Sequence, residues 1–227
     1  MTDTDQPAAQ PGPAKTRWGD RVGRRRDILA AARTQMADHG YLGLNMRDIA
    51  SGAGVSPGTL YSYFATKEEI FATLYAEAIV AHNERLQPIC DEATDLEELL
   101  VDVITAHLDL HGTYGRYFSL WAALAVDGAT GGNGEPAGLP EDLTASLRQA
   151  TLDQGGIVTG ALRRLVPGPR RAGEQRRRIA LVWSVMIGVA EQLHTERHHL
   201  SQVGSDELIR FAAHTVAAGF LANADDQ

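Results

Sequence analysis

Two short helices separated by a tight turn constrain this chain more than any other feature of its sequence. Asn45 is a favourable N-cap residue for a helix over 46–53, and Gly54 is expected to end that helix. Ser56 then caps a further helix, which has Pro57 at its first position, where a missing N–H leaves no helical hydrogen bond unmade. Two capped helices on either side of a glycine turn predict a helix-turn-helix.

Flanking segments extend this motif to a longer helical unit. Apolar residues recur at helical spacing upstream, at Ile28, Leu29, Ala32 and Met36. The first helix is therefore expected from Arg24 to just before Gly40, a residue suited to a C-terminal cap. After the motif, which is expected to end near Phe64, Thr66–Glu69 is a capping box whose end residues can satisfy each other's backbone N–H groups. It starts a long helix that is expected to stop at Pro88.

The rest of the chain is also predicted to be helical. Helical apolar patterns cover 96–110, 114–126, 141–165, 174–196 and 206–222, the last with Ser205 as its cap. The Gly-rich residues 127–140 and the prolines between 167 and 169 are expected to be loops, and no segment has a convincing strand pattern. The expected fold class is all-α, with about nine helices in all. The expected domains are a disordered N-terminal arm (1–22), a helix-turn-helix domain (23–67) and a larger helical domain (68–227).

Charge is distributed unevenly along the chain. The formal net charge is −8, yet residues 1–67 carry nine Lys and Arg against six Asp, which gives that segment +3. The densest part runs from Lys15 to Arg33, with seven basic and two acidic side chains. A basic segment on an acidic body is typical of a protein that binds phosphate groups, although a solvated charged tail has the same composition.

Composition limits the cellular location of the protein and the chemistry open to its cysteine. The chain has no apolar run of about 18 residues, and its first residues lack the apolar core of a signal peptide, so we expect no membrane association and a cytoplasmic location. The single cysteine, Cys90, cannot form an intrachain disulfide or a cysteine-rich zinc site. We expect Cys90 to be a structural residue near a helix end, because the adjacent Asp91 and Glu92 disfavour a reactive thiolate.

The second helix of the motif presents an unusual set of side chains. Leu60 and Phe64 are four residues apart and form its buried stripe. The outward side chains are then Thr59, Tyr61, Ser62 and Tyr63. A tyrosine ring can pack on sugar or base edges while its hydroxyl donates to a phosphate, so this surface favours DNA binding in the major groove.

Residues 24–75 resemble the DNA-binding domain of the tetracycline-repressor (TetR) family of bacterial regulators. The similarity is carried by the continuous stretch Arg47–Ile70, which contains both helices, the turn and the next helix cap. The resemblance implies that Arg47 reads a guanine, that Thr59 contacts a base or phosphate, and that Tyr61, Tyr63 and Lys67 contact the DNA backbone. The further residues that it brings near DNA are Arg24, Arg25, Arg26, Ser56, Pro57, Gly58 and Ser62. For the three arginines a solvated surface remains an equal alternative.

The resemblance also implies how the larger domain functions. The last two helices would pair across a two-fold axis, so that a homodimer presents two recognition helices to a near-palindromic operator in double-stranded DNA. A small-molecule effector, apolar or amphipathic, would bind among the middle helices and release the repressor from DNA. The candidate ligand-binding residues are Tyr75, His107, Leu108, Tyr114, Phe118, Trp121, Leu124 and Trp183. A ligand-independent or activating regulator, and a monomer with ordinary core helices, are the alternatives.

Two motifs indicate other chemistry. Gly54-x-Ser56-x-Gly58 matches the nucleophile elbow of a serine hydrolase, but an elbow needs a preceding strand, whereas this sequence follows a helix. His194 and His198 have the i, i+4 spacing of a metal site, with His199 adjacent, yet the sequence supplies no evident third ligand for zinc. We therefore expect no enzymatic activity, no cofactor and no bound metal.

Overall fold

The computed structural model describes residues 20–115, 130–131, 135–136, 138–166, 172–195 and 202–225. Within these ranges the α-helices are α1 (Arg21–Gly43), α2 (Met46–Gly52), α3 (Pro57–Tyr61), α4 (Lys67–Glu92), α5 (Leu96–Leu110), α7 (Glu141–Leu165), α8 (Ala172–His194) and α10 (Ser205–Asp225). A π-helical turn, η1 (His111–Gly115), continues α5. The two-residue strands β1 (Thr130–Gly131) and β2 (Glu135–Pro136) pair antiparallel, a minor exception to the expected absence of strands. The all-α fold class is confirmed.

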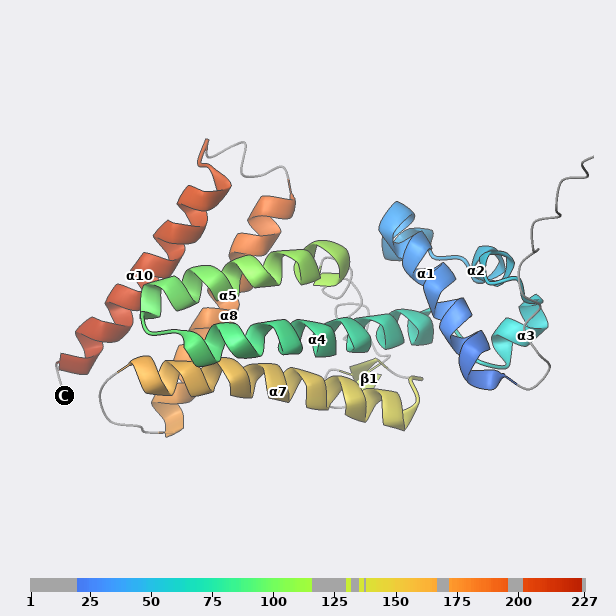
Figure 1. Ribbon diagram of the computed structural model, residues 1–227, viewed down its shortest axis with the longest axis horizontal. Helices are drawn as coiled ribbons and strands as arrows, with labels where there is room; N and C mark the ends of the chain where they lie inside the picture. Colours follow the sequence, from blue (N-terminus) through green and yellow to red (C-terminus); the bar gives the residue numbers. More distant parts are fainter. Residues whose placement is uncertain are drawn as a thin grey trace, which may run out of the picture.

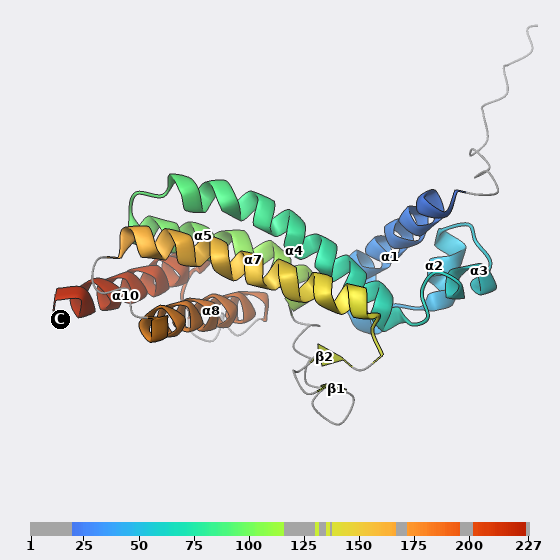
Figure 2. The same ribbon diagram turned by 90° about the horizontal axis from the view of Figure 1, so that it is seen from below.

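The long helix α4 connects two groups of helices (Figure 1, Figure 2). α1, α2 and α3 lie at one end of the molecule, and α4 runs from them along α7 and against α5. α8 and α10 pack on α5 toward the opposite end. Among the described residues, no helix is apolar over the length that a membrane crossing requires.

Two apolar cores meet along α4. The first core joins α1, α2 and α3 to the N-terminal half of α4, and its most buried members include Ile28, Ile49, Leu60, Phe64, Ile70, Phe71 and Leu74. The second core joins the C-terminal half of α4 to α5, α7, α8 and α10, and includes Leu86, Cys90, Leu99, Leu100, Val158, Leu162, Met186 and Ala213. Because α4 contributes to both cores, its position links the two ends of the molecule.

The expected stop of this helix at Pro88 is wrong. α4 passes through Pro88 and ends at Glu92. Leu86 and Cys90, on either side of the proline, are buried in the second core. The Arg164 guanidinium of α7 donates to the backbone carbonyl of Cys90 and to two more carbonyls at this end, groups that lack donors within the helix. Tertiary packing therefore outweighs the local preference of proline.

Other helix boundaries differ from expectation by a few residues. α1 begins at Arg21, within the expected arm, because Asp20 Oδ1 accepts a hydrogen bond from the Gly23 backbone N at 2.7 Å. Gly40 has a φ of 64° and interrupts α1, as expected of a C-terminal cap. Ser205 is the first residue of α10 rather than its cap. Several expectations fall outside the described residues: the arm over 1–19, most of 116–137, the prolines between 167 and 169, and His198 and His199.

Buried histidines lie between α4 and α5. The ring centres of His82 and His107 are 5.7 Å apart, and that of His111 is 5.9 Å from His107. Burial, assisted by the charge of Arg85, lowers the pKa of His82 to about 4. Burial and the two neighbouring histidines lower the pKa of His107 to about 3. Both imidazoles are therefore neutral in the folded protein at pH 7.

These two histidines should make the protein less stable in acid. An unfolded histidine has a pKa near 6.5, so on acidification the unfolded chain binds protons before the folded chain does. The free energy of unfolding should be independent of these groups well above pH 6.5, and should fall as the pH drops from 6.5 toward their folded pKa values of about 4 and 3, by about 2 kcal/mol per histidine at pH 5. Urea unfolding should show a smaller loss in His82→Gln and His107→Gln, while the exposed His39→Gln keeps the parent profile. Parent-like profiles in both buried variants would contradict this assignment.

Candidate functional site

Capping hydrogen bonds hold α2 and α3 in a fixed relation. The Asn45 side chain accepts from the Arg47 backbone N at 2.9 Å at the start of α2. Gly54 has a φ of 65°, the left-handed conformation in which the chain turns after α2. Ser56 Oγ accepts from the Thr59 backbone N at 3.1 Å and starts α3. The predicted helix-turn-helix is therefore present.

Buried side chains fix α3 against the domain. Leu60 and Phe64 form the predicted stripe and are almost completely buried with Ile49 in the first core. The regular helix ends at Tyr61, earlier than expected. The Phe64 backbone N still donates to the Leu60 carbonyl at 3.0 Å, so the following turn keeps helical spacing and Phe64 reaches the core. This anchoring leaves the opposite face of α3 at the surface.

The outward face differs from the prediction at two positions. Tyr61 is 55% exposed, and the other predicted contacts that are exposed are Arg47, Ser56, Pro57, Gly58 and Ser62. Thr59 is half-buried, with its Oγ1 2.9 Å from Ser56 Oγ. Tyr63 is also half-buried, because its ring packs on the first core and the Arg21 guanidinium lies 5.5 Å from the ring centre. The predicted contacts on α2 and α3 thus remain accessible except at Thr59 and Tyr63, which are half-buried.

The start of α4 joins this surface to α1. Thr66 Oγ1 accepts from the Glu69 backbone N at 3.1 Å, as the capping box predicts. The Glu69 carboxylate, however, accepts from the Ala65 backbone N at 2.7 Å rather than from Thr66. The Lys67 ammonium lies 4.8 Å from the centre of the Tyr41 ring, a cation–π contact that orients it. Lys67 thus stands at the positive end of the α4 dipole, which favours an anion.

The arginines of Arg24–Arg26 lie in the first two turns of α1. Arg25 faces α4, with its guanidinium 5.2 Å from the centre of the Phe64 ring and 3.9 Å from a Glu77 carboxylate oxygen. Arg33 pairs with the same carboxylate. No local sequence pattern indicates this connection between α1 and α4, because its partners are 44 residues or more apart along the chain.

The Gly54-x-Ser56-x-Gly58 sequence lies between two helices, and Ser56 Oγ is engaged at the start of α3. A hydrolase elbow lies instead between a strand and a helix. Within the described ranges, no group of three or more His, Cys, Asp or Glu side chains is placed to hold a metal ion.

A cavity of about 290 Å³ lies in the body, between α4, α5, η1, α7 and α8. Of the candidate ligand-binding residues, Tyr75, His107 and Trp183 line it. Leu108 packs on the second core, and Tyr114 lies against the Tyr75 ring at 5.8 Å between centres. The other candidates, Phe118, Trp121 and Leu124, lie outside the described residues.

Three polar lining residues were not predicted: His111, Thr151 and Gln154. Thr151 and Gln154 belong to α7, whose spacing of polar residues is that of a solvated helix face. Gln154 is buried whereas Thr151 stays exposed, and the burial of Gln154 depends on how α7 packs, so no local sequence pattern could have identified it.

The N-terminal part of the chain is similar to a known protein family. Residues 28–74 match the family described as "Bacterial regulatory proteins, tetR family". The match covers about a fifth of the 227 residues. The matched segment extends from the buried part of α1, through α2 and α3, into the first turns of α4, so it contains the capped motif and its core.

Curated relatives are similar to part of this chain. A fatty acid metabolism regulator protein of Bacillus subtilis is 36% identical over 83 residues, which cover 37% of this chain and 43% of the relative. The transcriptional repressor KstR2 of Mycolicibacterium smegmatis is 34% identical over 86 residues, or 38% of this chain and 42% of the relative. The chain thus matches less than half the length of these relatives.

Solved structures share the fold over most of the chain. The transcriptional regulator FadR from Bacillus subtilis, solved in complex with stearoyl-CoA, superposes with a TM-score of 0.56 and 20% identity, covering 86% of this chain and 98% of FadR. A tetR-family regulator from Streptomyces coelicolor gives a TM-score of 0.61 and 21% identity, covering 91% of this chain and 84% of the regulator. At these identities the similarity concerns the fold alone.

Proposed function

We propose that the protein is a DNA-binding transcriptional regulator that acts as a homodimeric repressor and is released from a near-palindromic operator by a small apolar or amphipathic ligand. The observation that carries the proposal is the capped helix-turn-helix of a tetR-family domain, with Arg47, Tyr61 and Ser62 exposed on one surface. Two relatives, a fatty acid metabolism regulator and a transcriptional repressor, support the proposal. DNA as the partner implies a cytoplasmic location and no enzymatic role.

In this proposal residues 23–67 bind DNA and residues 68–227 bind ligand and the second subunit. α3 enters the major groove, and the Arg47 guanidinium reaches a guanine through its two parallel donors. Tyr61 and Lys67 hold phosphates on the two sides of the groove. Ser56 and Gly58 bring the free N–H groups at the start of α3 close to the backbone.

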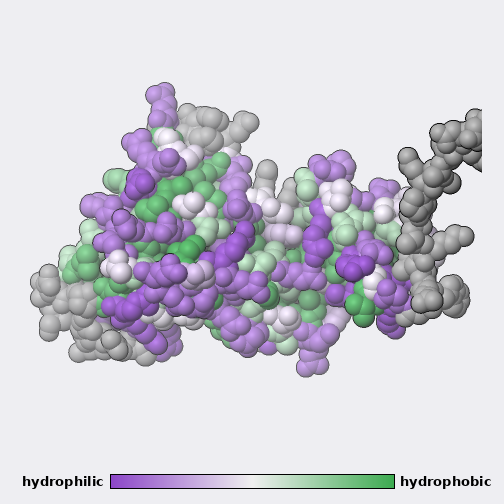
Figure 3. Space-filling model, in the orientation of Figure 1, coloured by the Kyte–Doolittle hydropathy of each residue, from purple (hydrophilic) through white to green (hydrophobic). Residues whose placement is uncertain are grey.

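The surface of α8 and α10 supports a homodimer. These helices carry large exposed apolar side chains, among them Leu181, Phe211 and Leu221, of which Phe211 is the most exposed at 69%. Figure 3 shows hydrophobic surface gathered over α10 and beside it. Large exposed apolar side chains are typical of a subunit interface. A two-fold axis at these helices would present two α3 helices to one operator.

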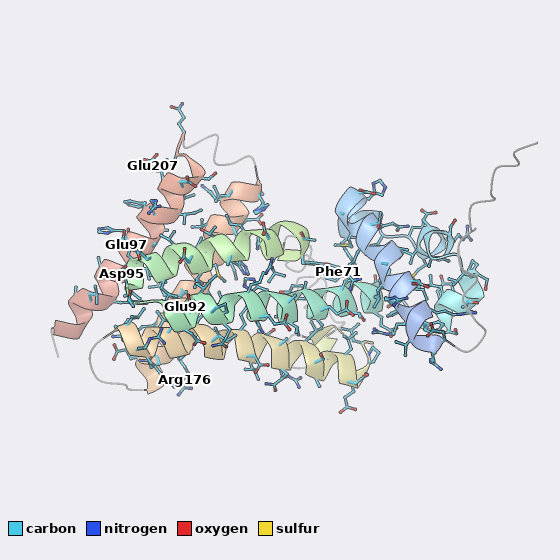
Figure 4. The ribbon with its side chains drawn as sticks, viewed as in Figure 1. Phe71, Glu92, Asp95, Glu97, Arg176 and Glu207 are labelled. Atoms are coloured by element: carbon cyan, nitrogen blue, oxygen red, sulfur yellow. The ribbon has the colours of Figure 1, made fainter. Side chains whose placement is uncertain are left out.

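An aromatic column along α4 supports coupling between ligand and DNA. Tyr75 lines the body cavity and stacks on Phe71, with ring centres 6.2 Å apart and planes inclined by 7°. Phe71, labelled in Figure 4 where α4 passes α1, meets the Tyr41 ring edge-on at 4.9 Å. The Tyr41 ring in turn makes a cation–π contact with the Lys67 ammonium. A ligand that displaces Tyr75 would therefore shift Lys67, and by linkage DNA would weaken ligand binding equally.

Substitution of the two DNA-contacting cations should have different effects. Arg47→Ala should reduce discrimination at one base pair of each half-site by roughly 1–3 kcal/mol, because a bidentate base contact is lost. Lys67→Ala should weaken all sequences alike and lower the slope of log affinity against log salt by about 1. Band shifts with duplexes from the DNA flanking the gene, including single-base changes, measure both. Arg163→Ala, exposed on α7, is the control, and parent-like binding by both test variants would refute the groove assignment.

A charge on the apolar face of α10 should separate the subunits. Phe211→Glu places a carboxylate in the proposed interface and should cost about 2 kcal/mol or more of association free energy, which weakens the dimer at least about thirtyfold. Sedimentation velocity should find a dimer for the parent and a monomer for the variant. Leu152→Glu, on the exposed face of α7, is the matched control and should remain dimeric. A monomeric parent would rule out the homodimer.

Shortening the aromatic column should uncouple the two sites. Phe71→Leu keeps an apolar side chain in the first core but removes the ring stacking, worth about 0.5–1.5 kcal/mol per pair. Operator affinity without ligand should change little, while release by a ligand selected in a thermal-shift screen should become several-fold weaker. The measurement is ligand affinity with and without operator. Equal affinities in the parent would indicate a ligand-independent regulator instead.

A further inference from the structure

The body cavity combines apolar walls with polar groups and no full charge. Trp183, Leu110 and Ile187 supply apolar surface, while His107 and Gln154 supply hydrogen-bonding groups. None of the described lining residues is a lysine, arginine, aspartate or glutamate. An anionic or cationic group would lose its hydration there without gaining an opposite charge from these residues, so the walls favour an uncharged occupant.

Two residues that line this cavity each have a buried polar atom without a hydrogen-bond partner. Gln154 is 5% exposed and its Nε2 has no acceptor; His107 is 8% exposed and its Nδ1 has no partner. Buried polar groups in folded proteins are almost always paired, so unpaired ones on the residues that line a cavity are candidates for contact with a ligand. Gln154 Nε2 can only donate, and therefore requires an acceptor. The neutral His107 ring offers its Nδ1 as the complementary partner.

Neighbouring polar groups of the cavity are already engaged. His111 Nε2 lies 3.2 Å from a Glu191 carboxylate oxygen, and Thr151 Oγ1 donates to the Leu147 carbonyl at 2.9 Å. Among the described lining residues, buried polar atoms without a partner thus occur on one residue of α5 and one residue of α7.

We infer that this cavity binds a compact, uncharged, planar molecule that presents a hydrogen-bond acceptor beside a donor, as a ring amide does. The carbonyl oxygen would accept from Gln154 Nε2, the ring N–H would donate to His107 Nδ1, and the flat ring would pack against Trp183. The volume of about 290 Å³ corresponds to about ten water molecules at liquid density and suits one or two fused rings. The inference rests on the proposed function and narrows its ligand class.

The test uses 2-quinolinone, a bicyclic lactam, as the probe, with naphthalene as a control of the same shape without polar atoms. Isothermal titration should give a Kd for 2-quinolinone at least tenfold lower than that for naphthalene, because only the lactam satisfies both buried groups. Stearoyl-CoA forms the third arm and represents a long-chain amphipathic ligand. The inference would be overturned if naphthalene bound as tightly as the lactam. It would also be overturned if stearoyl-CoA bound and the other two probes did not.

Gln154→Leu separates a ligand contact from a structural role. It removes an unpaired buried amide, so the melting temperature should stay equal or rise, while the Kd for 2-quinolinone should rise about tenfold and that for naphthalene should not. Gln149→Leu, the same change at an exposed position of α7, should leave both values unchanged. Destabilisation by Gln154→Leu with unchanged lactam affinity would assign the amide a structural role and refute the proposal.

Operator binding measured without any probe separates a failure of the ligand class from a failure of the proposed function. If the parent binds operator DNA and the lactam does not bind, the ligand class fails and the proposed function stands. If operator binding is absent while the lactam binds with the expected variant pattern, the cavity assignment stands and the regulatory function fails.

Discussion

The shared use of α4 by both apolar cores is the constraint on which the rest of the structure depends. Ile70, Phe71 and Leu74 belong to the first core, and Leu86 and Cys90 to the second. A rotation of this helix that moved one group out of its core would expose the other as well. Since close-packed interiors do not deform continuously, the helix is expected to move as one body, which suits a connection between a DNA surface and a cavity.

Charge and hydrogen bonds restrict the same helix at its two ends. Near the DNA surface, Glu77 of α4 holds Arg25 and Arg33 of α1, and the Tyr41 hydroxyl donates to Glu68 at 3.0 Å. At the far end, Arg164 of α7 binds the terminal carbonyls. At the neighbouring start of α5, Figure 4 labels Asp95 and Glu97, and His214 of α10 lies 2.8 Å from Glu97. Because exposed ion pairs contribute little each, the position of α4 depends mainly on the two apolar cores.

Local sequence patterns predicted the parts of the structure that depend on local chemistry. The caps Asn45, Ser56 and Thr66 and the turn at Gly54 were correct, because each acts through neighbours within three residues. α5 and α7 were also predicted with the bounds that the structure has. The prediction failed at Pro88, where distant residues supply the packing and the carbonyl donors. Tyr63 was misplaced for the same reason, since Arg21 covers it from another helix.

The body cavity could be predicted only in part. Aromatic residues at helical spacing correctly predicted that Tyr75, His107 and Trp183 line the cavity. The same reasoning also selected Leu108, which packs against the second core. Gln154 could not be predicted as a cavity residue, because a glutamine in a polar helix is ordinary. Only the packing of the helices shows that its Nε2 is buried without a partner. Residues that face a cavity are defined by how helices pack, and sequence spacing within one helix does not contain that information.

The burial of Cys90 limits how the protein can sense its surroundings. Burial, with a further contribution from Asp91, raises the pKa of this thiol to about 11, so at neutral pH only about one molecule in ten thousand carries a thiolate. Oxidants and electrophiles react with thiolates, and the chain has no other cysteine. Any signal it receives through its body must therefore be held by reversible contacts rather than by a bond to sulfur. Such a receptor keeps no record of past exposure, and its occupancy follows the ligand concentration of the moment.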